Sequence, residues 1–172
     1  MKINKVTTIC CIGTVVLAIF SMGCKTIVNP LIKNYTDPYH EKLEKAGFTE
    51  KSLKIRETNL HYAEGPDNGP ALLLLHAQIM DWLDYSRVLP ELSKSYHIFV
   101  VDYNGHGKTT APASPMNANT IGNILATFMK DKIKEPAFVS GNSSGELLTV
   151  WLAANKPQLV RAILLEDPPY EE

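Results

Sequence analysis

The sequence predicts an α/β fold in which a mostly parallel sheet carries helices on both faces. Three apolar runs, at residues 71–75, 97–101 and 160–165, have the composition of strands that are buried on both faces. Two stretches between them, residues 119–133 and 144–155, carry apolar residues in a pattern that suits helices. Strands that alternate with helices form parallel sheets with right-handed crossovers, and functional residues gather at the carboxyl ends of such strands.

Shorter elements precede and separate these runs. Residues 53–62 alternate between apolar and polar side chains, which predicts two short strands around a turn at residues 57–59. Residues 65–70 are rich in Gly and Pro and form a loop. A helix is expected at residues 82–93, where Pro90 bends or divides it.

The N-terminal segment is expected to be a membrane anchor or a lipoprotein-type signal, covering residues 1–24. Lys2 and Lys5 precede 19 residues without a charge, at positions 6–24, and this length can cross a bilayer as a helix. The run also resembles a cleaved secretory signal, and its end at Cys24 partly matches the sequence at which bacterial lipoproteins are lipidated. All these alternatives place the globular part outside the cytoplasm, because the lysines stay on the inner side.

The rest of the chain divides into a linker and one domain. Residues 25–50 are expected to be a linker with a short helix at residues 41–46, which Gly47 ends. Residues 51–172 are expected to form the globular domain, and a chain of 172 residues is long enough for one domain of ordinary size.

Charge and cysteine content exclude several kinds of function. The 17 Lys and Arg residues nearly balance the 18 Asp and Glu residues, so no basic surface for nucleic acid is expected. All three cysteines lie within the first 24 residues, which leaves the domain no thiol for a disulfide, a zinc site or cysteine catalysis. Neither a metal nor a cofactor is expected.

A candidate nucleophile lies at residues 141–145, where Gly-Asn-Ser-Ser-Gly fits the pattern G-x-S-x-G. The motif follows a short predicted strand at residues 137–140 and opens a predicted helix, which is the context it requires. The sharp turn holds Ser143 in a strained conformation between small residues, and the helix N-terminus directs N–H groups at a developing oxyanion. The Ser144 N–H would be one of these donors.

Two further motifs follow predicted strands, namely His76-Ala77-Gln78 and the D-x-x-G-x-G sequence of residues 102–107. With these three motifs in this order, residues 52–169 resemble the first six strands of the α/β-hydrolase fold. The resemblance implies a serine hydrolase that acts on a small-molecule ester or amide through an acyl-enzyme. It also implies that Gln78 or its neighbour supplies the second oxyanion N–H.

The resemblance also implies that His76 and His106 hold their loops rather than catalyse. The sequence departs from the family pattern in three ways. Ala77 replaces the usual glycine, and would be strained if its position required positive φ. Glu146 replaces a residue that is frequently small, and would crowd the sheet.

The third departure is that no histidine follows Ser143, although the family places its general base after the last strand. Glu166 or Asp167 is the candidate acid, with a structural turn as the alternative reading of Asp167. We therefore expect a serine hydrolase by descent that is weak or inactive as this chain. The simplest account is truncation after the sixth strand, which would expose an edge of the sheet and one side of the core.

Two alternatives come from other functional classes. Gly107-Lys108-Thr109 suggests a phosphate-binding loop, but Asp102 stands where that motif needs its first glycine, so this reading is rejected. The other alternative is a non-catalytic, membrane-tethered α/β-hydrolase-like module, which the missing histidine favours and the intact motif around Ser143 opposes.

Overall fold

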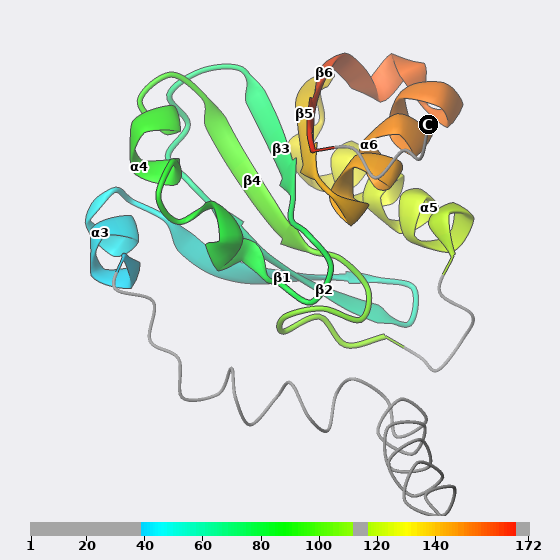
Figure 1. Cartoon of the computed structure of the whole chain (residues 1–172), viewed down its shortest axis with the longest axis horizontal. Helices are drawn as coiled ribbons and strands as arrows, with labels where there is room; N and C mark the ends of the chain where they lie inside the picture. The colour runs from blue at the N-terminus through cyan, green and yellow to red at the C-terminus, as the bar shows by residue number, and fades with distance from the viewer. Residues whose placement is uncertain (1–38, 112–116, 168–172) are drawn as a thin grey trace, which may run out of the picture. The chain divides into compact units, whose positions relative to one another are not determined.

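A computed structural model describes residues 39–111 and 117–167, which form a six-stranded sheet in the order β1-β2-β4-β3-β5-β6 (Figure 1). The strands are β1 Thr49–Ile55, β2 Thr58–Glu64, β3 Ala71–Leu75, β4 His97–Asp102, β5 Ala137–Asn142 and β6 Val160–Glu166. β3, β4, β5 and β6 run parallel, whereas β1 and β2 form an antiparallel hairpin that pairs with β4. The predicted mostly parallel sheet is confirmed.

Helical segments cover both faces of this sheet, as predicted. On one face lie α5 Ala118–Phe128, its π-helical continuation η2 Met129–Ile133, and α6 Ser144–Asn155. On the other face lie α3 His40–Lys45, the 3₁₀ helix η1 Trp82–Tyr85 and the short α4 Leu89–Leu92. Figure 1 shows the two groups on opposite sides of the strands. A second 3₁₀ turn, η3 Pro157–Leu159, leads from α6 into β6.

Each face has its own apolar core, because alternate residues of a strand point to opposite sides. Leu73 and Leu75 of β3 pack toward α5 and α6, together with Leu125 and Leu152 of those helices. The other core contains Leu72 and Leu74, which join residues from α3, η1 and α4. The alternation explains why β3 is apolar throughout.

Several predicted boundaries differ from the structure, among them the start of the domain, because α3 and β1 begin before residue 51. The hairpin turn lies at Arg56 and Glu57 rather than at residues 57–59, and Arg56 takes a positive φ of 53°. The single helix predicted for residues 82–93 is divided into η1 and α4, and Pro90 stands in the first turn of α4, where its missing N–H costs no helical bond. The helix predicted for residues 119–133 changes to a π-helical turn at Met129.

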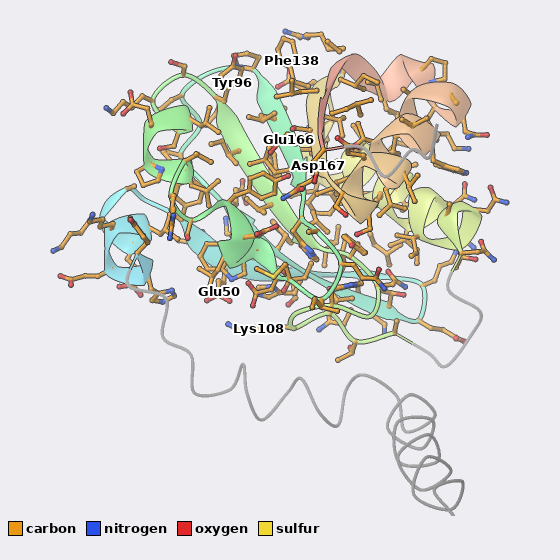
Figure 2. All side chains as sticks on the ribbon, viewed as in Figure 1. Glu50, Tyr96, Lys108, Phe138, Glu166 and Asp167 are labelled. Carbon is orange, nitrogen blue, oxygen red and sulfur yellow. The ribbon has the colours of Figure 1, made fainter. Side chains whose placement is uncertain are left out.

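The prediction of a buried last strand is wrong for β6, whereas the expected exposed sheet edge is present. Residues 161–164 of β6 are all exposed, with 63% of Leu164 accessible. Beside this strand lies a groove of about 420 Å³ on the α4 side of the sheet, lined by apolar side chains that include Tyr96, Phe138 and Leu164. Figure 2 shows Tyr96 and Phe138 together at one end of the sheet, where their rings make an edge-to-face contact with centroids 5.9 Å apart.

Residues 6–24, for which an anchor or signal is predicted, lie outside the described residues. In residues 39–111 and 117–167, no helix has both the length and the apolar character needed to cross a bilayer.

Candidate active site

Ser143 lies at the sharp turn where β5 ends and α6 begins. Its backbone has φ 50° and ψ −113°, a conformation that costs a non-glycine residue on the order of 1–3 kcal/mol. The turn is fixed on both sides, because the Ser143 N–H donates to Glu166 O at 3.1 Å and the Glu146 N–H donates to Ser143 O at 3.0 Å. The strained strand-to-helix turn predicted from the motif is therefore present at Ser143.

The two glycines of the motif are sterically required. A Cβ on Gly141 would lie 2.4 Å from the carbonyl of Gly145, and a Cβ on Gly145 would lie 2.0 Å from Leu75 O. Both distances are far below any real carbon–oxygen contact. Both glycines of the G-x-S-x-G pattern are therefore needed because α6 lies so close to β3 and β5 at this point.

The loop after β3, which holds the predicted oxyanion donor Gln78, is pinned at its first peptide. The Ala77 N–H donates to Asp84 Oδ2 at 3.1 Å, and His76 Nδ1 lies 2.8 Å from Ala77 O. Ala77 is not among the residues with positive φ, so the strain considered for it does not arise. Ile79 takes positive φ instead, at 65°, which is unusual for a β-branched residue. Gln78 is exposed in the loop that follows the carboxyl end of β3.

Ser144, the other predicted oxyanion donor, is the first residue of α6, so its N–H has no partner inside the helix. Its hydroxyl is 2.8 Å from the Tyr103 hydroxyl, which ties the start of α6 to the loop after β4. Tyr103 is buried and stacks on His76 with ring centroids 4.5 Å apart and 16° between their planes.

Asp102 organises the loops at the carboxyl end of the sheet. Its Oδ1 accepts the Trp82 N–H at 2.7 Å, and its Oδ2 accepts the Lys108 N–H at 2.9 Å and lies 2.8 Å from His61 Nδ1. Burial alone would raise the pKa of Asp102, but the hydrogen bonds from His61 and Lys108 outweigh it, so the pKa lies below its usual value. A Cβ on Gly107 would lie only 1.9 Å from Asp102 Oδ2, which explains that glycine.

The neighbourhood of Asp102 continues outward to the first strand. The His61 ring also lies 2.8 Å from Glu50 Oε2, and Lys108 pairs with Glu50 at the surface, where Figure 2 shows both side chains. The β1–β2 hairpin is thereby connected to the D-x-x-G-x-G loop.

The candidate acids take different positions at the end of β6. The Glu166 carboxylate accepts a hydrogen bond from the Ser140 hydroxyl. Asp167 is exposed and has a positive φ of 65°, which fits the turn role considered for it. Figure 2 shows the two side chains next to each other, close to the start of α6.

Histidine positions agree with the loop-holding role implied for His76 and His106. His76 is fully buried, and His106 Nδ1 lies 3.3 Å from Asn104 O. Burial lowers the pKa of both rings, which favours their neutral forms. All five histidines lie in the described residues, and none of their ring nitrogens is hydrogen-bonded to Ser143. Nor do His, Cys, Asp and Glu residues of this part of the chain form a group of three placed to hold a metal ion.

The sequence indicates Ser143 and the loops around it, but not the side chains that hold these loops. Asp102 stands out in the sequence only as the first residue of its motif, although its place at the end of a buried strand indicates a polar anchor. No local pattern identified Asp84 or Tyr103, because their partners lie 7 and 41 residues away.

The chain is similar in sequence to known hydrolases. Residues 70–172 match the alpha/beta hydrolase fold family. The 2-(acetamidomethylene)succinate hydrolase of Mesorhizobium japonicum is 27% identical over 73% of this chain and 45% of its own length. Lipase 3 of Moraxella sp. is 28% identical over 87% of this chain and 50% of its own length. The chain thus spans about half the length of these curated relatives.

A solved structure supports the same fold. A membrane phospholipase A, described as a bacterial virulence factor, superimposes with a TM-score of 0.72 over 94% of this chain and 52% of its own, at 23% identity. At that identity the likeness concerns the fold alone. The family match and the geometry around Ser143 agree, and the chain belongs to the alpha/beta hydrolase fold family.

Proposed function

We propose that this chain carries the nucleophile of a serine hydrolase that acts on small-molecule esters or amides. The observation that carries the proposal is the backbone of Ser143, held at φ 50° between a strand and a helix by two obligatory glycines. Strain of this kind persists where the surrounding structure enforces it, and it is characteristic of functional turns. The names of the hydrolase and lipase relatives support the same class of reaction.

In the proposed reaction, Ser143 Oγ attacks the substrate carbonyl and forms an acyl-enzyme that water then hydrolyses. The N–H groups of Ser144 and Gln78 would stabilise the oxyanion, because one starts α6 and the other lies in the loop that Asp84 pins beside it. Glu166 or Asp167 would orient the base.

The general base is the group that this chain lacks. A serine hydroxyl needs a base within about 2.6–3.2 Å, and no histidine follows Ser143 in the sequence. Loss of a catalytic-triad member lowers turnover by on the order of 10⁴–10⁶. We therefore propose that the chain alone hydrolyses simple esters such as p-nitrophenyl acetate barely above background.

A fluorophosphonate probe in large excess tests the nucleophile. We expect slow labelling of Ser143, identified by mass spectrometry, which Ser143→Ala abolishes and the exposed control Ser52→Ala retains. Added imidazole should accelerate ester hydrolysis by the wild-type chain more than by Ser143→Ala, because it substitutes for the base. Labelling at another serine, or equal labelling in Ser143→Ala, would refute the assignment.

The missing base also favours a second candidate, a non-catalytic module that keeps the hydrolase scaffold. This candidate predicts that Ser143 reacts no faster with the probe than Ser52, with or without imidazole. The first candidate predicts faster labelling of Ser143, since this residue directly precedes the N-terminus of α6.

We further propose that residues 1–24 attach the chain to a membrane, with the domain that includes α3 and β1 outside the cytoplasm. The support is the uncharged run of 19 residues after Lys2 and Lys5. Full-length protein should enter the membrane fraction, and Leu17→Lys should reduce this, while the control Lys25→Arg should not. Recovery of the intact wild-type chain in the soluble fraction would contradict the proposal.

A further inference from the structure

Glu146 is a carboxyl group buried in the first turn of α6 without a partner. Its residue has 0% exposure, and neither carboxyl oxygen has a hydrogen-bond partner in the described part of the chain. The spacing Ser143-x-x-Glu146 would suit a capping box, but Ser143 is not in a capping conformation and no side chain caps the helix. The Glu146 side chain therefore has no capping function.

The charges that act on Glu146 are acidic. α6 packs against β3, β5, α5 and η3, which contain no titratable residue, and against β6, which carries Arg161 at its start and Glu166 at its end. β6 contributes Glu166, followed at once by Asp167 (Figure 2), and η1 contributes Tyr85, whose pKa is raised mainly by burial. Burial raises the pKa of Glu146, and the charges of Asp167 and Glu166 raise it further.

Glu146 is also coupled to the nucleophile turn through the backbone. Its N–H donates to Ser143 O at 3.0 Å, while the Ser143 N–H donates to Glu166 O at 3.1 Å. Ser143 is thus held between the residue that bears the buried carboxyl and the strand end that bears the opposing carboxylates.

We propose that Glu146 is a pH-sensitive latch on the Ser143 turn. As the neutral acid, it lets the first turn of α6 pack against the end of β6. Ionised, it is a buried charge facing two carboxylates, and it separates these elements and releases the hydrogen bond from Ser143 to Glu166. The latch acts on the turn named in the proposed function, but it is measured on folding and exchange, so either can fail while the other holds.

The direction of the pH effect follows from linkage. The unfolded chain ionises Glu146 near the ordinary value of 4.5, whereas the folded chain keeps the proton to higher pH. Stability is therefore greatest below that value and declines as the pH rises toward the folded pKa. Within this window the folding equilibrium constant falls up to tenfold for each pH unit from this group alone.

Urea unfolding of the full chain between pH 4 and 9 tests the first half of the proposal. We expect Glu146→Gln to gain stability over the wild type as the pH rises above 4.5, up to tenfold in the equilibrium constant per unit, until the difference levels off above the folded pKa. Thr149→Val, one turn along α6, changes another buried polar group without removing an ionisable one and should parallel the wild type. A constant difference between Glu146→Gln and the wild type across this range would overturn the proposal.

Hydrogen exchange of the Ser143 amide, corrected for the intrinsic rate, tests the second half. Protection should fall with rising pH in the wild type, remain in Glu146→Gln, and fall less in Asp167→Asn, where one repelling charge is gone. Unchanged protection in the wild type would overturn the latch even if stability changes. If Glu146→Gln does not fold, the wild type and Asp167→Asn still decide the question.

Discussion

At the scale of single residues, the site is built from groups whose local preferences are overruled. Ser143 accepts a backbone conformation that favours glycine, and Ile79 does so with a β-branched side chain. Close packing enforces the conformation of Ser143, because the backbone lies so close to its neighbours at Gly141 and Gly145 that neither position has space for a Cβ. The motif around Ser143 can be predicted from the sequence because its residues are contiguous. The positive φ of Ile79 cannot, because positive φ is expected at glycine or asparagine and not at a β-branched residue.

Replacing Ser143 by glycine should stabilise the protein. Glycine adopts positive φ at little cost, so Ser143→Gly should raise the free energy of unfolding by about 1 kcal/mol. The neighbouring Ser144→Gly should lower it by about 1 kcal/mol or more, because it places glycine in a helix and removes the Tyr103 hydrogen bond. Urea unfolding measures both, and a stability loss in Ser143→Gly would show that the turn is not strained.

Removing the charge of Asp102 should be among the most damaging single changes. Asp102→Asn leaves the His61 ring, the buried Trp82 N–H and the part-buried Lys108 N–H without their charged acceptor, and should cost about 3–5 kcal/mol. The exposed change Asp131→Asn should stay within about 0.5 kcal/mol of the wild type. Thermal or urea unfolding decides, and a loss below about 1 kcal/mol in Asp102→Asn would show that the loops do not depend on this carboxylate.

At the scale of elements, strand order and type could be predicted because apolar runs and turn residues are local signals. β3, β4 and β5 lie where the sequence placed them, and so does α6. The division of residues 82–93 into η1 and α4 could not be foreseen in detail, because Asp102 accepts the Trp82 N–H in a contact between residues 20 positions apart. The exposure of β6 depends on what lies beside it, which its own apolar sequence does not encode.

The exposed apolar groove along β6 should bind hydrophobic dyes. Leu164 is 63% exposed at its rim, so Leu164→Lys should reduce the fluorescence of bound anilinonaphthalene sulfonate with little change in stability. Leu147→Lys, at an exposed position on α6 outside the groove lining, provides the matched control and should reduce it less. Equal effects of the two changes would mean that dye binding does not report the groove.

At the scale of the whole molecule, buried ionisable groups make stability depend on pH in opposite directions. The pKa of Asp102 is lowered, so its contribution is present above the ordinary value of 3.8 and is lost as the pH falls. Burial lowers the pKa of His76 and His106, which also removes stability as the pH falls below 6.5. The raised pKa of Glu146 acts in the opposite direction. The pH dependence of stability is therefore expected to have an acid limb, caused by Asp102, His76 and His106, and an alkaline limb, caused by Glu146.

His76 provides the clearest test of the acid limb. Its ring is fully buried, and burial, outweighing the Ala77 carbonyl and Asp102, lowers its pKa below 6.5. Below pH 6.5 His76 is protonated in the unfolded chain but stays neutral in the folded chain. The free energy of unfolding therefore falls by up to about 1.4 kcal/mol per pH unit. His76→Gln should be less stable at pH 8, because it loses the stacking on Tyr103, yet its stability should fall less steeply between pH 6.5 and 5.

Leu72→Ala, which removes a buried apolar side chain and no ionisable group, should be destabilised while keeping the wild-type slope. Urea unfolding at several pH values separates the two variants, and parallel profiles for His76→Gln and the wild type would show that His76 is not held neutral by the fold.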